Sequence, residues 1–562
     1  MGFALDDYIH LLIFEGQWPL GSPFDLFRFA GGSPEGMRRI VQEGPYPWWT
    51  LPELKISFWR PLSSALAVLD HRLWGRNALG YHLHSLAWYL GVVALLGALL
   101  RRLWPGSLVA LALLLFAVDE AHLLPVGWIA NRNALVSTVL ALGGLWMHLE
   151  WREARRPWAL PLSLVALAAS LTAGESALGV FAYLLAYELF GARGTGGERL
   201  RAIAPAAVLA LVYLGVYKAL GYGAYGSNMY LDPVGEPGRY LVAALGRVPA
   251  LIGGLLGVPV DLWGLSADSR PVLVGLGLGG LALLVFLLRS AWSGLSEEER
   301  RHCRWLGAGA LLSLLPVASS LPMGRLLFVP SVGASVLLAV VLLHAWRSRK
   351  QGWRPRGVVV AGAVLALMNL VLAPLSWPAM SMMIRQLGET TARTAQELRR
   401  ELDPARLPSQ RVVILDARDL GTVLYTPVLW ALQGNERPLS WWMLSLVQES
   451  PIVTRTGPAS LALEMPRGGH FLTSDAEQSV RGSEFMLETG AQVSLEGMRV
   501  TVLAADAQGP TRLGFDFDTP LEDPSLVFLH WREGALRRLV PPPEGSRLEL
   551  STVKGGGPAQ PL

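Results

Sequence analysis

Long apolar runs recur through the middle of the chain, from Tyr81 to Trp377. A helix needs about 20 apolar residues to cross roughly 30 Å of hydrocarbon, and short polar connections separate the runs. The pattern predicts spans near 82–101, 106–122, 132–149, 157–173, 176–190, 200–220, 270–290, 303–320, 326–346 and 356–376. Only 16% of the 562 residues are charged, against about 25% in ordinary soluble domains. The sequence therefore predicts a mostly α protein, a polytopic membrane bundle of about 10–11 spans.

The same pattern divides the chain into four regions. Residues 1–79 are rich in Trp, Pro and Phe, which is typical of an exterior loop with short interfacial helices. Residues 80–377 form the bundle, and 378–407 read as a polar connecting helix. Residues 408–562 are expected to fold as an exterior β-rich (α+β) domain, with strands near 411–416, 500–504, 513–517 and 525–531 and a helix near 426–431.

One apolar stretch, Tyr240–Gly257, is interrupted by Arg247, Pro249 and a Gly-Gly pair. Counting this stretch as a span would invert the alternation of every later basic connection. It is therefore predicted to be an exterior or re-entrant helix covered by protein or water.

Arginine sets the orientation, because basic clusters fall in alternate connections, at 101–102, 152–156, 193–201, 300–304 and 347–356. Cytoplasmic loops carry the excess of Lys and Arg, so residues 1–79, the connection 221–269 and everything after about 378 are predicted to lie outside. The arginine-rich, lysine-poor composition is typical of a bacterial chain, which places it in the cytoplasmic (inner) membrane. The first residues are not a signal peptide, so this topology also predicts a further helix preceding the sequence.

Charge and cysteine content exclude other classes. The formal net charge of +4 comes mostly from topology-setting arginines and does not indicate nucleic acid. The single cysteine, Cys303, excludes an internal disulfide and a cysteine-based metal cluster.

Candidate chemistry begins near the N-terminus, with Asp6, Asp7 and His10 within about one helical turn. Two adjacent carboxylates near a membrane surface can serve as a general base and its charge-coupled partner. The alternative is that an Asp caps a helix.

Further polar groups interrupt the apolar bundle, where ionisable side chains are costly and usually functional. They are His122 with Asp119 and Glu120, Asn131 and Arg132, Glu175, and Arg325. By the topology above, all open to the same exterior face as Asp6, with Arg60 nearby as a packing or substrate contact. Carboxylates and arginines around one cavity would suit an anionic lipid-linked substrate, with Arg binding phosphate bidentately. Helix capping and interfacial snorkelling remain the alternative.

Several motifs resemble those of GT-C class membrane glycosyltransferases, in particular the O-mannosyltransferase-like (protein mannosyltransferase and tetratricopeptide-associated) proteins. They are Leu5-Asp-Asp-Tyr-Ile-His10, Phe58-Trp-Arg-Pro-Leu62, Gly80-Tyr-His-Leu-His-Ser85, His122 with Trp128-Ile-Ala-Asn-Arg132, Glu175, and Gly324-Arg-Leu-Leu-Phe-Val-Pro-Ser331. Leu124 and Gly324-Arg-Leu326 depart from the family pattern, and no tetratricopeptide array follows the bundle.

The resemblance implies inverting transfer of a sugar from a polyprenyl-phosphate donor to a protein hydroxyl, glycan or lipid acceptor at the outer face. Asp6 or Asp7 would act as the base, with Asp6 preferred because similar enzymes use the first acidic residue. Arg132 and Arg325 would bind the donor phosphate, and His10, Arg60, His122, Asn131 and Glu175 would shape the pocket. No ligand spacing requires a metal, and a divalent metal stays open. A transporter of lipid-linked sugars and a non-catalytic envelope scaffold are the alternatives.

Overall fold

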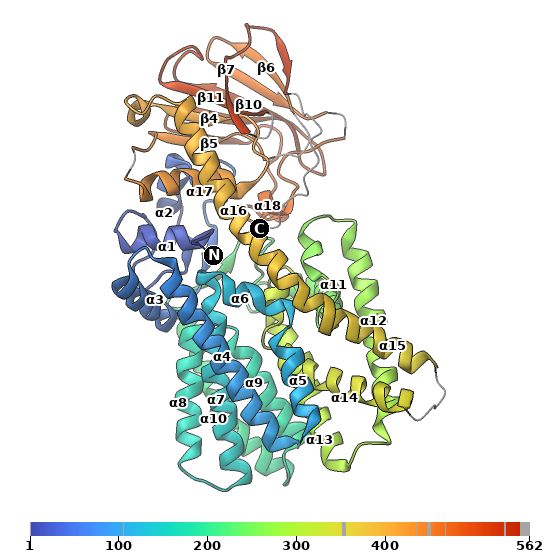
Figure 1. Ribbon diagram of the computed structural model, residues 1–562. Coiled ribbons are helices and arrows are strands. Elements are labelled where there is room, and N and C mark those ends of the chain that lie inside the picture. Colours follow the sequence, from blue (N-terminus) through green and yellow to red (C-terminus); the bar gives the residue numbers. More distant parts are fainter. Residues whose placement is uncertain are drawn as a thin grey trace.

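The computed structural model describes residues 2–104, 106–350, 356–434, 436–446, 451–466, 468–532 and 535–550. It has a helical bundle at one end, a β-rich region at the other, and the N-terminal segment between the two (Figure 1). The predicted fold class, a helical membrane bundle with a β-rich C-terminal region, is confirmed.

Every predicted span contains helix. The bundle comprises α4 (Ala78–Leu103), α5 (Ser107–Ala117), η1 (Glu120–His122), α6 (Leu123–Gly127), η2 (Ile129–Arg132), α7 (Asn133–Glu153), α8 (Ala159–Ala173), α9 (Ala177–Ala186), η3 (Tyr187–Gly191), α10 (Gly196–Ala219), α12 (Ser269–Trp292), α13 (Glu297–Val317), η5 (Gly324–Leu327), α14 (Ser331–Lys350), α15 (Arg356–Ala366) and η6 (Leu367–Leu372).

Fewer helices than expected are long and apolar enough to cross a membrane. Six described helices meet both conditions, or seven if the pair formed by α5 and residues 120–127, bent by 51°, counts as one. The others fall short for physical reasons, because α8 has 15 residues, α9 has 10, and α13 begins with three glutamates followed by Arg300, Arg301 and Arg304. The chain is a multi-pass membrane protein.

Ion pairs gather the basic connections at one end of the bundle. Arg102, at the end of α4, pairs with Glu150 of α7, and Arg193 pairs with Glu298 of α13. The buried Glu188 accepts hydrogen bonds from Arg152 and lies 2.8 Å from His148 Nε2. Four of the five basic clusters thus share one end, and residues 351–355 of the fifth lie outside the described part.

The N-terminal segment folds as α1 (Asp6–Phe14), β1 (Arg28–Gly31), α2 (Pro34–Glu43), β2 (Lys55–Ser57) and α3 (Pro61–Trp74). β1 and β2 pair antiparallel, and β2 also pairs with β3 (Gly223–Tyr225), which follows α10. This small sheet joins the segment to the end of the bundle opposite the basic clusters. The interrupted stretch is helical, as expected: α11 (Pro237–Gly254) packs on α12 and is followed by η4 (Val260–Gly264).

The C-terminal region begins on α16 (Ala373–Glu401), which continues α15 out of the bundle (Figure 1). The strands expected there are confirmed, as is the helix, α17 (Leu420–Leu432). The remaining elements are η7 (Leu407–Ser409), β4 (Arg411–Ile414), β5 (Ser440–Met443), β6 (Ile452–Gly457), β7 (Ser460–Glu464), α18 (Asp475–Gln478), η8 (Ser483–Phe485), β8 (Gln492–Leu495), β9 (Met498–Ala505), β10 (Pro510–Phe517), β11 (Leu526–Arg532), β12 (Ala535–Leu539) and β13 (Arg547–Glu549).

These strands form two sheets. One has the order β13-β6-β7-β10-β9-β8 and is antiparallel, and the other has the order β12-β11-β4-β5, with β4 parallel to both neighbours. Side chains of both sheets pack into one core with Trp48 and Trp49 of the N-terminal segment. The two ends of the chain therefore fold as one unit.

Tryptophan side chains hydrogen-bond to backbone carbonyls along the seam between the N-terminal segment and the C-terminal sheets. Trp48 Nε1 donates to the Leu444 carbonyl at 3.0 Å, and Trp442 Nε1 donates to that of Gln42 at 3.0 Å. Gly44 has φ +99°, and a Cβ there would lie 1.8 Å from the Trp441 carbonyl oxygen. Only glycine allows the end of α2 to approach β5 so closely.

Candidate active site

A cavity of about 540 Å³ lies where the bundle meets the N-terminal segment. Its walls come from α1, β1, the start of α3, the Trp128–Ala134 stretch, the α8–α9 junction, the end of α10, the α10–α11 connection, and the α13–α14 connection. The lining includes five of the nine candidate residues predicted from the sequence, namely Asp6, Arg60, Asn131, Glu175 and Arg325. Residues up to about 320 positions apart in the chain thus line the same cavity.

Many polar atoms of the cavity lining make no hydrogen bond within the described part of the chain. Six lining residues carry a buried nitrogen or oxygen that makes no hydrogen bond with any described residue: Trp128 Nε1, Asn131 Nδ2, Glu175 Oε1, Tyr213 Oη, Ser320 Oγ and Arg325 Nε. Buried polar atoms are normally hydrogen-bonded, because desolvation without a partner costs about 1–3 kcal/mol each. The wall is therefore suited to a polar ligand.

Two arginines of the cavity differ in how they are held. Arg60 Nε donates to Glu175 Oε2 at 2.7 Å, and its guanidinium carbon lies 4.7 Å and 4.6 Å from the ring centroids of Phe27 and Phe58. Arg325 has no ion pair within the described part of the chain, and its guanidinium carbon lies 5.1 Å from the Trp128 ring centroid. Arg60 is neutralised and fixed, whereas Arg325 retains its charge and its planar fork for a ligand.

Asp6, in the first turn of α1, faces this cavity. Its Oδ1 accepts a hydrogen bond of 2.7 Å from the Tyr425 hydroxyl, and Oδ2 accepts none from any described residue. Burial raises the pKa of Asp6 above its ordinary value, while Tyr425, Arg325 and Arg60 act in the opposite direction. A carboxylate whose pKa is moved toward neutral pH is a stronger base than a solvated one.

Asp7 is held differently. Its carboxylate accepts hydrogen bonds from the backbone N–H of Ala4 at 3.0 Å and of Ala130 at 2.8 Å, and the residue is 3% exposed. Burial raises the pKa of Asp7 to about 7. Leu5, at the N-cap, has φ +52°, a conformation that costs about 1–3 kcal/mol in a non-glycine residue. Asp7 thus fastens the start of α1 to η2, and neither Asp is the N-cap.

The remaining four candidate residues, Asp7 and the three described next, lie outside the cavity lining. His10 packs edge-on against Phe27, and burial lowers its pKa to about 3, so it is neutral. His122 lies 2.9 Å from Ser331 Oγ and 3.2 Å from the Tyr89 hydroxyl. Arg132 forms a buried ion pair with Asp70. The expectation that Arg132 and His122 reach the same cavity as Arg325 is therefore not met by this geometry.

Two further residues, which are not among the candidates predicted from the sequence, are prominent in the structure. Asp70 is fully buried in α3, accepts the charge of Arg132, and lies 2.7 Å from His84 Nδ1. Asp70 could have been recognised from the sequence, because it is an acidic residue in the apolar run of α3. Tyr425, in α17, is 419 positions from Asp6, and no local pattern could have joined the two.

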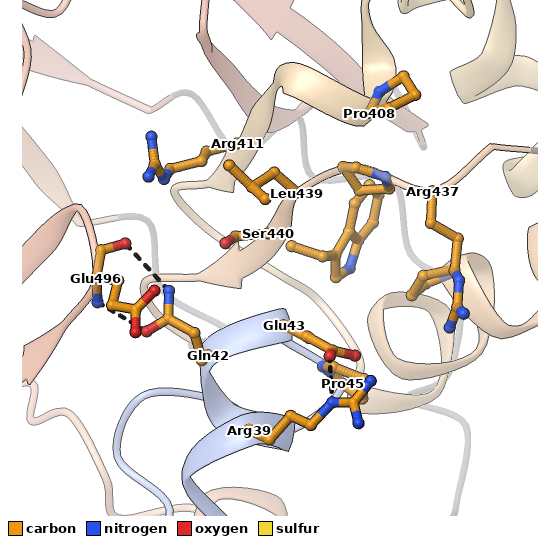
Figure 2. A pocket seen from close by; sticks show the side chains of 13 residues that line it. Arg39, Gln42, Glu43, Pro45, Pro408, Arg411, Arg437, Leu439, Ser440 and Glu496 are labelled. Carbon is orange, nitrogen blue, oxygen red and sulfur yellow. Dashed lines mark hydrogen bonds and ion pairs between the residues drawn. The ribbon is translucent and has the colours of Figure 1, made fainter. Parts of the chain in front are cut away.

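A second cavity, of about 430 Å³, lies at the seam between α2 and the C-terminal sheets. Its arginines do not converge, because Arg39 pairs with Glu43 and Arg411 points away from Arg437 (Figure 2). No group of three or more His, Cys, Asp or Glu within the described ranges is placed to hold a metal ion.

Comparison with known proteins gives distant structural neighbours only. No family model matches the chain, and no curated protein does. The crystal structure of ArnT from Cupriavidus metallidurans bound to undecaprenyl phosphate is 14% identical, covers 75% of this chain and 83% of its own, and has a TM-score of 0.34. The apo state of that protein is also 14% identical, covers 72% and 81%, and has a TM-score of 0.26.

Proposed function

We propose that the protein is a membrane glycosyltransferase that moves a sugar from a polyprenyl-phosphate donor to a hydroxyl-bearing acceptor. One observation carries the proposal: one cavity at one end of the bundle brings together Asp6 and the guanidinium of Arg325, which forms no ion pair with any described residue. The reaction needs a base for the acceptor and a cation for the leaving phosphate. Placement of this end outside a bacterial inner membrane rests on the positive-inside rule.

The proposed step is a single displacement. Asp6 Oδ2 takes the proton of the acceptor hydroxyl as its oxygen attacks the anomeric carbon. The bond between that carbon and the donor phosphate oxygen breaks, and its electron pair leaves with the lipid phosphate. Attack opposite to the leaving group inverts the anomeric configuration. Arg325 stabilises the charge that grows on the phosphate, and such donors act best when already oriented in a site shielded from water.

The other lining residues have supporting parts in this proposal. The Glu175–Arg60 pair fixes one wall, and the unpartnered Asn131 and Tyr213 offer hydrogen bonds to sugar hydroxyls. Aromatic side chains, including Phe58 and Tyr230, provide apolar faces for sugar rings. The polyprenyl chain would lie along the apolar exterior of the bundle.

The experiment is transfer by the purified protein in proteoliposomes, from radiolabelled polyprenyl-phosphate mannose or glucose to an envelope protein and glycan extract. Mannose comes first because the local motifs resemble O-mannosyltransferases. Label in the acceptor fraction with an inverted linkage supports the proposal. Movement of intact donor across the bilayer without transfer would identify a transporter instead, and donor that is neither bound nor moved would leave a scaffold role.

A further inference from the structure

We propose that Tyr425 of the C-terminal domain is a positioning residue for the catalytic carboxylate, which it orients from behind through its hydroxyl. The inference rests on the proposed function and deepens it, because it gives the C-terminal domain a part in the reaction. It starts from one contact, the 2.7 Å hydrogen bond from the Tyr425 hydroxyl to Asp6 Oδ1.

The bond has the geometry of a charge-assisted contact. A hydroxyl that donates to a carboxylate at 2.5–2.7 Å forms one of the stronger hydrogen bonds in proteins. Tyr425 is 5% exposed and does not line the cavity, whereas Asp6 does. Because Tyr425 donates to Oδ1 from the side away from the cavity, Oδ2 is the oxygen that is left for the acceptor.

The position of Tyr425 is fixed by packing on both sides of α17. Trp430 Nε1 donates to the Ala395 carbonyl of α16 at 2.8 Å, and Trp441 Nε1 donates to that of Val423 at 2.9 Å. Restraints of this kind limit rotation and sliding of α17, which carries Tyr425. The phenol is thus presented by a rigid support, which a positioning role requires.

The face of α17 that carries Tyr425 packs on α1, the helix that carries Asp6. Val428 and Leu432 share an apolar cluster with Ile9, Leu12 and Ile13 of α1. At the far end, Arg76 donates to the Leu432 carbonyl at 2.5 Å and to Glu15, next to α1, at 2.6 Å. α1, which carries Asp6, and α17, which carries Tyr425, are therefore packed as one rigid unit.

Against the raising effect of burial, three groups lower the pKa of Asp6: Tyr425 on α17, Arg325 on η5 and Arg60 at the start of α3. Asp7 on α1 and Tyr46 after α2 also face Asp6, and burial together with the charge of Asp6 raises the pKa of each. Only Tyr425 donates a hydrogen bond to Asp6 within the described residues; the Tyr46 hydroxyl donates to the Phe29 carbonyl instead.

The sign of the effect follows from the bond. A donor to the charged form favours ionisation, so the Tyr425 hydroxyl lowers the pKa of Asp6 against the opposing effect of burial. Without the hydroxyl, Asp6 binds its proton more tightly and is ionised only at higher pH. The acidic limb of the rate–pH profile should then move to higher pH.

The test compares Tyr425→Phe with wild type over the pH range. We expect the acidic limb of the transfer rate to move up by about one pH unit, with a plateau rate within about threefold of wild type. Tyr46→Phe is the matched control and should leave the limb in place.

An infrared titration gives a readout that does not depend on activity. The carbonyl stretch of protonated Asp6, isolated by subtracting the Asp6→Asn spectrum, should titrate at higher pH in Tyr425→Phe than in wild type. An unchanged titration, together with an unchanged limb, would overturn the inference. Absence of transfer by wild-type protein would refute the proposed reaction, while the infrared titration would still decide whether Tyr425 controls Asp6.

Discussion

Arg325 is the residue in the cavity whose charge is left for a ligand, and its shape matters as much as its charge. Lys in its place would keep the charge but lose the planar fork and the stacking on Trp128. Arg325→Lys should therefore weaken binding of the polyprenyl-phosphate donor by about tenfold or more. The control is Arg270→Lys, because Arg270 also lies over a tryptophan, Trp263, but outside the cavity. Equal donor affinity of both variants, measured by titration calorimetry in detergent, would contradict the assignment.

Asp6 is the proposed base, whereas the neighbouring Asp7 holds the start of α1 in place, and single substitutions can distinguish these two roles. In Asp7→Asn the new amide cannot accept from both Ala4 and Ala130, so one buried N–H loses its partner. We expect a loss of about 1–3 kcal/mol in stability, with turnover of the folded fraction changed by less than about tenfold. Thermal unfolding in detergent and the transfer rate of the same preparation test this. A stable Asp7→Asn protein with abolished transfer would make Asp7 the base instead.

At the scale of elements, the sequence predicts what depends on local periodicity. The apolar period located the bundle helices, and strand-length apolar runs such as 411–416 and 513–517 located the sheets. Whether α8 and α9 cross a full bilayer could not be predicted from hydropathy, because their lengths depend on the turns that end them. The contact between α2 and β5 at the seam could not be predicted either, because it joins segments about 400 positions apart.

That seam supplies a prediction of its own. Gly44→Ala would place a methyl group against the Trp441 carbonyl, whereas Gly16, at φ +70°, has open space around it. Both substitutions cost about 1 kcal/mol for the left-handed backbone, but only Gly44→Ala also has to separate two packed segments. We expect Gly44→Ala to lower the melting temperature markedly more than Gly16→Ala. Equal shifts in scanning fluorimetry would show that the seam is not tightly closed.

For the whole molecule, the proposed function requires the cavity end of the bundle to face outside the cytoplasmic membrane and the end with the basic clusters to face the cytoplasm. Glu35 and Ala507 are exposed at the cavity end, and Gly196 is exposed at the end of the basic clusters. In a Cys303→Ser background, Glu35→Cys and Ala507→Cys should react with a membrane-impermeant maleimide in intact spheroplasts. Gly196→Cys should react only after permeabilisation. The reverse pattern would place the cavity in the cytoplasm.

The candidate site could be predicted from sequence only in part, for reasons that belong to the whole fold. Glu175 and Arg325 stand out because ionisable groups are rare in the apolar bundle, whereas Asp6 and Arg60 stand out through the acidic pair and the Phe58-Trp-Arg-Pro motif. Composition cannot show which charges are already paired, so Arg132 resembled Arg325 although Asp70 neutralises it. Tyr425 enters the site through docking of the C-terminal domain, a contact that no local pattern encodes.

The central claim is that Asp6 removes the proton of the acceptor in a cavity that also holds the donor phosphate. Single-turnover transfer by Asp6→Asn in proteoliposomes, with donor binding measured in the same sample, tests it most directly. Asn keeps the size and hydrogen-bonding capacity of Asp6 but cannot accept a proton at neutral pH. We predict a loss of about 100- to 10,000-fold in the transfer rate, with donor affinity within a few fold of wild type. Equal rates of transfer by Asp6→Asn and wild type would show that Asp6 is not the catalytic base.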